Sequence, residues 1–171
     1  MSAVAGRTAA TAGRVAVAAS RRIPADPARV FALALNTGLF PSLFPGFGPI
    51  PAVLSVERLD DGPLAVGSRR RVRSSDGGEL LEQVLELVEA RRHRYVVSGF
   101  RPPFSWWVQA AEADWRFTPC AEGTEVRWEY RFAARGWLAR LPVTVLAHLC
   151  FRPAMRRCLE RLAHVSAARR F

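Results

Sequence analysis

The sequence predicts an α+β domain in which a curved, seven-stranded antiparallel sheet wraps around one long C-terminal helix. The first observation is the stretch 124–132, where apolar and charged residues alternate without exception after Thr124. A period of two is typical of a strand with one buried and one solvent-exposed face. The second observation is a series of strand patterns before this stretch, joined by short turns. The third is a helical period that follows it to the last residue.

The chain is expected to begin its fold with a strand over residues 14–23. Asp26 followed by Pro27 predicts a helix start, because Asp caps free backbone N–H groups and Pro is favoured at the first helical position. Residues 38–51 follow and are rich in Phe, Gly and Pro. This composition allows one more short helical turn but no long helix.

Five more strands are expected before the alternating stretch, at residues 52–59, 66–74, 79–88, 92–100 and 105–118. Short connections that contain Gly, Pro or Asp separate most of them, which favours antiparallel hairpins. No helical period interrupts the strands, so the pattern excludes a doubly wound α/β fold.

Residues 137–171 change to a period near 3.6 and predict the terminal helix. We expect its inner stripe to consist of Leu141, Thr144, His148, Phe151, Met155, Cys158, Leu162 and Val165. Pro142 can stand at the start of this helix. Pro153 falls inside it and is expected to kink it there.

Length and composition favour one domain. The 171 residues suffice for one core, which we place at residues 14–171, behind a loose tail at 1–13. No uninterrupted apolar run reaches the roughly 18 residues of a membrane span, and the first residues lack the apolar run of a secretory signal. Three cysteines without metal-ligand spacing are interpreted as reduced thiols. Together these features predict a cytoplasmic protein.

The net charge of +10 comes from 25 basic residues, all of which are arginine. One interpretation is a partner with negative charge, either a nucleic acid or an anionic membrane. The other is a solvated basic surface, which we favour because the arginines are spread along the chain. The one dense cluster is Arg69, Arg70, Arg71 and Arg73. No nucleic-acid-binding motif accompanies it, so no nucleic-acid partner is expected.

Several local motifs accompany this order of elements. They are 23–27 leading into Val30 and Phe31, the tripeptide 66–68, Asp76-Gly77, the strand 82–84 and the stretch 123–128. In this order and with these motifs, residues 14–165 resemble the START-like, Bet v 1-like superfamily (SRPBCC), specifically its polyketide cyclase/dehydrase and lipid-transport branch. The resemblance implies a helix-grip fold with an internal cavity. None of the motifs is catalytic, so the resemblance implies no active-site residue.

The aromatic residues of the last two strands are the main candidates for a binding site. If Trp128 and Tyr130 face inward, the neighbouring strand contributes 107, 109, 111, 113, 115 and 117 by parity. These residues form either a pocket or ordinary core, and we favour a pocket because large aromatic rings among alanines pack poorly without a ligand. The candidate ligand-binding residues are Trp107, Gln109, Trp115, Trp128, Tyr130, Thr144, His148, Phe151, Met155, Phe44 and Phe47. The segment 38–51 is expected to lie at the cavity mouth as a gate.

Polar candidates are few. Gln109 either binds a ligand or lies in water at a strand end, and the sequence leaves both open. His148, with Tyr130 and Gln109, could act in acid–base catalysis, although a histidine packed between helix and sheet is the simpler interpretation. Glu82 and Glu86 are expected in solvent, because the opposite parity of their strand, 81, 83, 85 and 87, is mostly apolar and should face inward. No motif for a metal or a nucleotide is present, so no cofactor is expected.

Three hypotheses for function remain. The first is binding or carriage of a hydrophobic or aromatic, lipid- or polyketide-like small molecule. The second is a cofactor-free polyketide cyclase or dehydratase that uses the same cavity. The third is peripheral membrane contact through the Phe/Pro segment and the arginines. The sequence leaves the oligomeric state open.

Overall fold

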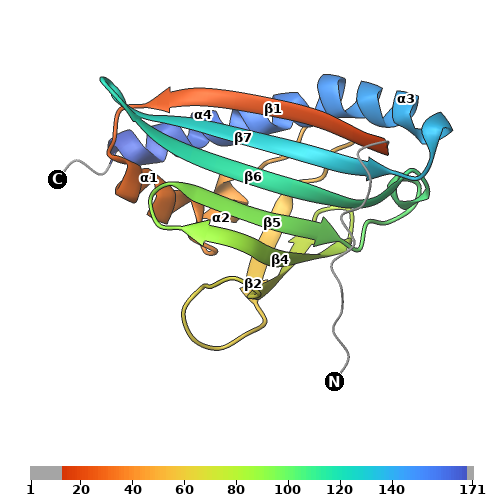
Figure 1. Cartoon of the computed structure of the whole chain (residues 1–171), viewed down its shortest axis with the longest axis horizontal. Helices are drawn as coiled ribbons and strands as arrows, with labels where there is room; N and C mark the ends of the chain where they lie inside the picture. The colour runs from red at the N-terminus through yellow and green to blue at the C-terminus, as the bar shows by residue number, and fades with distance from the viewer. Residues whose placement is uncertain (1–12, 169–171) are drawn as a thin grey trace.

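The computed structural model describes residues 13–168, and these form one antiparallel sheet with helices on its concave side (Figure 1). The strands are β1 (Arg14–Ile23), β2 (Val53–Arg58), β3 (Arg69–Ser74), β4 (Glu79–Val88), β5 (Arg92–Ser98), β6 (Val108–Cys120) and β7 (Gly123–Ala134). The helices are α1 (Pro27–Ala34), α2 (Phe40–Leu43), the 3-10 turn η2 (Phe104–Trp106), α3 (Trp137–Leu146), the π-helical turn η3 (Ala147–Phe151) and α4 (Arg152–Ala168). The expected α+β helix-grip fold is confirmed. Residues 1–12 of the expected tail and 169–171 lie outside the described residues.

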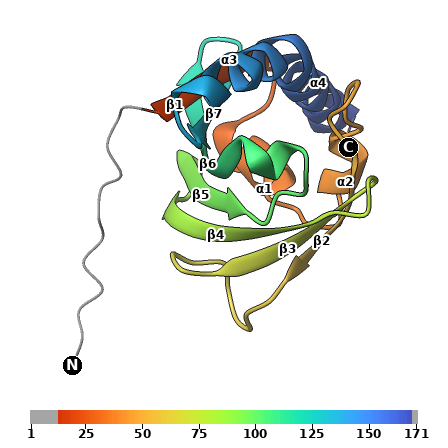
Figure 2. The same ribbon diagram turned by 90° about the vertical axis from the view of Figure 1, so that its right-hand side faces the viewer.

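The strand order in the sheet is β1-β7-β6-β5-β4-β3-β2, so the first strand pairs with the last. Figure 2 shows the sheet curling around the space that α1, α2, α3 and α4 close from the other side. Helix α4 packs against β1, α1 and α2, so the last helix contacts the first strand and the first two helices. The expected N-cap is present, since Asp26 Oδ1 accepts a hydrogen bond of 3.1 Å from the Arg29 N–H.

The β6–β7 turn is fixed against the corner between β1 and α1. The Thr124 hydroxyl donates a 2.7 Å hydrogen bond to the Ala25 carbonyl. Gly123 has φ +130°, and a Cβ atom there would lie 2.4 Å from the Ile23 carbonyl oxygen. Only glycine fits such a close approach. This anchor helps to set the register of β7. The sequence predicted the alternation of this strand, and Val126, Trp128, Tyr130 and Phe132 are all buried.

The first part of strand β4, up to Val84, faces the opposite way from the expectation. A register shift between Val84 and Glu86 restores the expected orientation, so Glu86 joins the ion pairs of the outer face and Leu87 packs against the core. Glu82 and Val84 point to the concave side, whereas Leu81 and Leu85 are more than two-fifths exposed. Both faces of this strand carry apolar residues, so the period of two could not decide which face is buried. The inward position of Glu82 is stabilised by an ion pair with Arg70 on β3, at 2.8 Å. Arg70 is itself buried, which corrects the expectation that the whole arginine cluster is solvated.

The terminal helix also differs from its predicted stripe. Leu141, Thr144 and His148 are exposed, and the residues that face the sheet there include Val143 and Ala147. The reason is the π-helical turn η3, in which the N–H of residue 152 bonds to the carbonyl of residue 147. A π turn inserts one residue, so the stripe shifts by about one position, or about 100°, on its N-terminal side.

The interruption of the terminal helix lies just before Pro153, where a kink was expected. Pro153 stands in the first turn of α4, directly after the π turn. Proline in the interior of an α-helix lacks a donor and clashes with the carbonyl four residues earlier, and both problems are relieved where the regular helix restarts.

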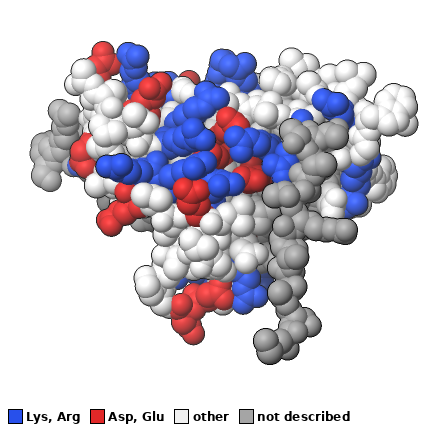
Figure 3. All heavy atoms as spheres, in the orientation of Figure 1, with Lys and Arg blue, Asp and Glu red and all other residues white. Residues whose placement is uncertain are grey.

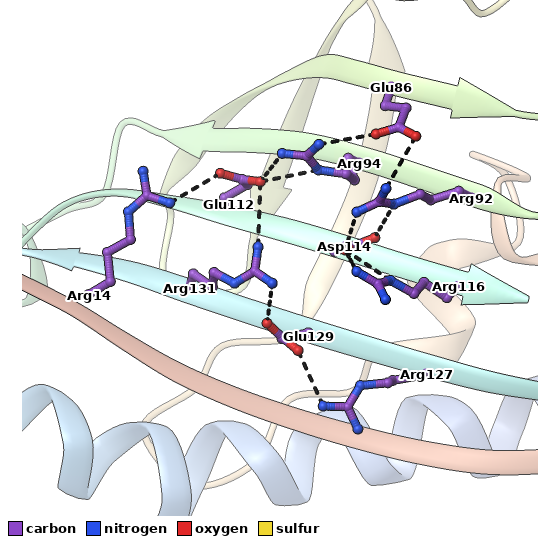
Figure 4. A network of polar contacts seen from close by, with 10 residues as sticks. All are labelled: Arg14, Glu86, Arg92, Arg94, Glu112, Asp114, Arg116, Arg127, Glu129 and Arg131. Atoms are coloured by element: carbon purple, nitrogen blue, oxygen red, sulfur yellow. Dashed lines mark hydrogen bonds and ion pairs between the residues drawn. The ribbon is translucent and has the colours of Figure 1, made fainter. Parts of the chain in front are cut away.

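The convex face of the sheet carries a network of ion pairs (Figure 4). Arginines of β1, β5, β6 and β7 alternate there with carboxylates of β4, β6 and β7. Asp114 lies at its centre, nearly buried, and accepts two hydrogen bonds from Arg92, at 3.0 and 2.8 Å, and two from Arg116. Red and blue atoms therefore intermix on the face seen in Figure 3. Such pairing favours the interpretation of the arginines as a solvated surface.

Candidate ligand-binding cavity

A cavity of about 350 Å³ lies between the concave face of the sheet and the helices. Its walls come from β3 to β5, β7, α2, η2, α3 and η3, and the segments that join them. Most of its lining side chains are apolar or aromatic. Its aromatic members include Phe40, Phe44, Trp107, Trp128, Tyr130 and Phe151.

Five of the predicted site residues lie on this wall: Phe44, Trp107, Trp128, Tyr130 and Phe151. They come from four separate parts of the chain that the sheet curvature brings together. Their rings also touch one another, with Tyr130 and Phe151 packed edge to face at 4.7 Å between centroids. Phe44 and Trp128 meet in the same way at 6.1 Å. The wall is therefore a continuous aromatic surface.

Three other predicted residues lie behind or beside this wall. Trp115 is buried and stacks on the outer side of Trp128, with 4.2 Å between ring centroids. Met155 is fully buried in the core. Phe47 is partly buried, with the Arg157 guanidinium 4.7 Å from its ring centroid. The three support the cavity wall without lining it.

The remaining three predicted residues lie away from the cavity. Gln109 is exposed, because a register shift between residues 108 and 110 removes it from the inward parity of β6. Thr144 is exposed and donates to the backbone carbonyl of Arg140 at 2.6 Å. His148 is exposed and lies beside β1, in a shallow polar hollow. The π turn accounts for the last two, since it rotates their helical face outward.

The segment 38–51 contributes one wall of the cavity. Phe40, Phe44, Pro49, Ile50 and Pro51 all line it. The rings of Phe40 and Phe44 stack at 6.3 Å. The expected position of this segment at the cavity agrees with the structure, and its opening and closing stays a prediction.

A buried polar cluster, which we call the Arg70–Glu82 cluster, lies at one side of the apolar cavity. Its members are Arg70, Glu82, His93, Tyr95 and Tyr130. The Arg70 guanidinium contacts Glu82 Oε2 at 2.8 Å and His93 Nε2 at 3.1 Å. It also lies over the Tyr95 ring, 5.3 Å from the centroid. Glu82, Tyr95 and Tyr130 line the cavity, so the cluster faces whatever occupies it.

The two phenols of the cluster influence each other's pKa. The Tyr95 hydroxyl also accepts a long hydrogen bond of 3.4 Å from the indole N–H of Trp115. Trp115 thus supports the site from behind the wall, through its ring and through its N–H group. Each phenol carries one O–H that can donate and an oxygen that can accept.

Burial decides the protonation states in this cluster. Burial, together with the nearby Arg70 cation, lowers the pKa of His93 to about 3, so the imidazole is neutral and Nε2 can accept from Arg70. Burial raises the pKa of Glu82 above its usual value, although Arg70 acts in the opposite direction. Burial also raises the pKa of Tyr130 well above 10. Both tyrosines are therefore neutral hydrogen-bonding groups at physiological pH.

Four members of this cluster, Arg70, Glu82, His93 and Tyr95, were not predicted as site residues. The alternation of β3 and β5 nevertheless indicated which of their side chains face inward. In β3, Arg70 shares its parity with Val72. In β5, His93 shares its parity with Tyr95 and Val97, which are obvious core residues. Applying the alternation to the polar residues of these strands would have placed Arg70 and His93 inside.

Residues 13–168 contain no candidate metal site and no candidate membrane-spanning helix. No grouping of three or more His, Cys, Asp or Glu side chains there could hold a metal ion. No helix in the same part of the chain is long and apolar enough to cross a membrane. Cys120, Cys150 and Cys158 are free thiols.

Solved structures with low sequence identity share this fold. The protein MLL2253 from Mesorhizobium loti is 16% identical with a TM-score of 0.69, over 92% of this chain and 100% of that one. The protein TTHA0849 from Thermus thermophilus is 22% identical with a TM-score of 0.67, over 92% and 100%. The major latex-like protein 151 from Panax ginseng is 13% identical with a TM-score of 0.65, over 90% and 98%. At these identities the likeness shows the fold alone.

A comparison with curated proteins finds no match. A family model, described as polyketide cyclase/dehydrase and lipid transport, matches residues 14–167, which is nearly the whole chain. This chain therefore belongs to the polyketide cyclase/dehydrase and lipid-transport family.

Proposed function

We propose that this protein binds a hydrophobic or aromatic, lipid- or polyketide-like small molecule inside the cavity and acts as a carrier or binding protein. The observation that carries this proposal is the cavity of about 350 Å³ with its aromatic wall. Its volume falls within the range of small-molecule sites, and a few polar groups converge on a mainly apolar surface. Family membership supports the same class of ligand.

The size of the cavity argues against a simple packing defect. Cavities cost about 24 cal/mol per Å³ in engineered cores, so 350 Å³ corresponds to roughly 8 kcal/mol. A typical domain is stable by only about 5–15 kcal/mol in total. A dry void of this size would therefore be too costly as a packing defect, which favours a space that solvent or a ligand occupies.

A cofactor-free cyclase or dehydratase is the second candidate. Glu82 favours it, because a carboxyl group with a raised pKa in an apolar cavity can exchange a proton with a substrate. Of the three catalytic candidates from the sequence, Tyr130 lines the cavity, while His148 and Gln109 lie outside it. An enzyme would therefore depend on Glu82 and Tyr130.

Two neighbouring tryptophans provide a matched test of binding. Trp107 lines the cavity, whereas Trp106 is 67% exposed. We expect Nile red to bind the wild-type protein with increased fluorescence, and Trp107→Ala to weaken its binding by about 1–3 kcal/mol. Trp106→Ala should bind like the wild type. Equal affinities of Trp107→Ala and the wild type, or no binding of any apolar probe from a broad panel, would contradict the proposal.

A further inference from the structure

We propose that the Arg70–Glu82 cluster selects ligands that carry an uncharged hydroxyl group at their buried end. This inference rests on the proposed binding function and specifies its ligand class. Its basis is the ion pair of Arg70 and Glu82, whose side chains are 8% and 12% exposed, at the wall of an apolar cavity.

The first argument concerns charge. Arg70 and Glu82 neutralise each other at 2.8 Å, and His93 beside them is neutral. The cluster therefore has no excess charge to offer. At the cluster, a ligand carboxylate or ammonium group would lose its hydration without gaining a counter-charge, which is strongly unfavourable. The other charged residues of the cavity wall, Asp76 and Arg101, belong to the turn between β3 and β4 and its surroundings.

The second argument concerns hydrogen bonds. An ionised Glu82 only accepts, and it presents its remaining exposed surface to the cavity. The phenols of Tyr95 and Tyr130 line the same cavity, and a phenol O–H can donate. A ligand hydroxyl can donate to Glu82 and accept from a phenol with one oxygen atom. A hydrocarbon can do neither, and a ketone or an ether can only accept.

The other acidic group at the cavity wall is already engaged. Asp76 Oδ1 accepts from the Ser74 hydroxyl at 2.7 Å and from the Gly78 N–H at 2.9 Å. These contacts belong to the turn between β3 and β4, and Arg101 donates to the backbone of the same turn. Asp76 therefore holds the turn, which leaves Glu82 as the acceptor for a ligand.

Three ligands of one skeleton test this preference: 2-naphthalenemethanol, 2-methylnaphthalene and 2-naphthoate. Each is titrated into the wild-type protein at pH 7.5, with binding followed by fluorescence or calorimetry. We expect the alcohol to bind about tenfold more tightly than the hydrocarbon, since it gains a hydrogen bond to a charged acceptor. The carboxylate should bind most weakly.

Substitution of Glu82 should reverse this order. Glu82→Gln removes the counter-charge of Arg70, so 2-naphthoate should become the preferred ligand, by about tenfold or more over the alcohol. Glu79→Gln is the matched control, because Glu79 lies on the same strand with an exposed side chain and should leave the order unchanged. A double variant, Arg70→Gln with Glu82→Gln, removes both charges and should bind the alcohol and the hydrocarbon with similar affinity.

The outcomes distinguish an error about hydroxyl selection from an error about the binding function itself. If the wild type binds the hydrocarbon as tightly as the alcohol, or if Glu82→Gln and the double variant keep the wild-type order, hydroxyl selection is wrong while binding stands. If the wild type binds none of the three ligands, the binding function itself is contradicted, and hydroxyl selection with it.

A different part of the molecule carries a second inference. The outward face of α3 and η3 is apolar and exposed, with Trp137 at 78%, Leu138 at 71%, Leu141 at 72% and Leu149 at 66%. Trp106 on η2 is also exposed. Exposed apolar residues gathered on one helix typically mark an interaction site.

The charged residues that the chain contributes on and next to this helical segment are all positive. Between residues 132 and 160 the chain has five arginines and no acidic residue. Arg135 and Arg140 belong to the α3 end, and Arg152 and Arg156 follow on α4. In Figure 3 this end of the molecule shows white and blue atoms, in contrast to the mixed charges over the sheet.

We infer that this face, defined by Trp106, Trp137, Leu138, Leu141 and Leu149, docks onto an anionic lipid bilayer. Trp and Leu side chains enter the boundary between headgroups and acyl chains, while arginines contact anionic headgroups. A second copy of the chain is a poorer occupant, because two such faces would bring arginines against arginines. The inward side of the same helix lines the cavity through Val143 and Leu146, so docking would place the cavity next to lipid.

The membrane surface differs from the one that the sequence suggested. That expectation relied on the Phe/Pro segment, but Phe40 and Phe44 point into the cavity and Phe47 packs under Arg157. The exposed apolar side chains belong to α3 instead.

Vesicle flotation tests the docking face. We expect the protein to float with vesicles of phosphatidylcholine and phosphatidylglycerol, much less with phosphatidylcholine alone, and less at high salt. Trp137→Glu with Leu141→Glu should reduce binding at least tenfold. Val66→Glu is the control, since Val66 is 65% exposed in a loop away from α3. Absence of flotation, or equal flotation of the α3 variant, would overturn the inference, as would a dimer that the α3 variant dissociates.

Discussion

His93 makes the protein sensitive to acid, and its substitution should remove that sensitivity. The pKa of its imidazole falls from 6.5 to about 3 on folding, because the ring is buried beside the Arg70 cation. Below pH 6.5 the unfolded chain binds a proton at this site and the native chain does not, so the stability of the native state falls as the pH falls. At pH 5, 1.5 pH units below 6.5, the loss is about 2 kcal/mol. It continues to grow until the pH reaches the native pKa.

Urea denaturation at pH 7.5 and at pH 5 measures this effect. His93→Gln keeps an acceptor for Arg70 but cannot bind a proton, so between the two pH values it should lose about 2 kcal/mol less stability than the wild type. Glu82 has the opposite trend, because its raised native pKa favours the native state as the pH falls, but it is present in both proteins. His148→Gln is the control, since His148 is exposed. If the wild type and His93→Gln lose the same stability, His93 is not buried as a neutral group.

Three further predictions concern the sheet and the cavity wall. Asp114→Asn should lower the free energy of unfolding, measured in urea, by about 2–3 kcal/mol, because it breaks the partly buried ion pair with Arg92. Glu122→Gln is the control and should change this free energy by less than about 1 kcal/mol, because Glu122 belongs to an exposed pair. Gly123→Ala should cost on the order of 3 kcal/mol in the same assay, because its Cβ would strike a backbone carbonyl at 2.4 Å. Hydrogen exchange in the segment 38–51 should slow when 2-naphthalenemethanol binds, and unchanged exchange would contradict the gate.

The sequence predicted the architecture because its signals there were local and consistent. The expected bounds of the first strand, 14–23, agree with β1, and the Asp26 cap starts α1 as expected. Over residues 125–132 of β7 every apolar residue shares one parity, so only one orientation buries them all. Where the capping residues, the residue alternation and the burial all indicate the same element, the sequence predicts that element reliably.

The polar part of the site could not be predicted in the same way. The expected interior of β4 relied on Leu81 and Leu85, and the structure exposes both so that Glu82 can reach Arg70. Gln109 and His148 were displaced by backbone irregularities, a register shift in β6 and a π turn in the terminal helix. An insertion of this kind changes which side chains face inward, although the residue pattern on either side stays regular.

The Arg70–Glu82 pair is better explained by ligand selection than by stability. A buried ion pair loses much of its attraction to desolvation, and its replacement by apolar residues of similar size is often neutral or stabilising by about 1–4 kcal/mol. We therefore expect Arg70→Met with Glu82→Leu to unfold at the same or a higher urea concentration than the wild type. The same variant should bind 2-methylnaphthalene at least as tightly as 2-naphthalenemethanol. A double variant that is several kcal/mol less stable would mean that the pair holds β3 against β4, and the preference for a hydroxyl would then need another source.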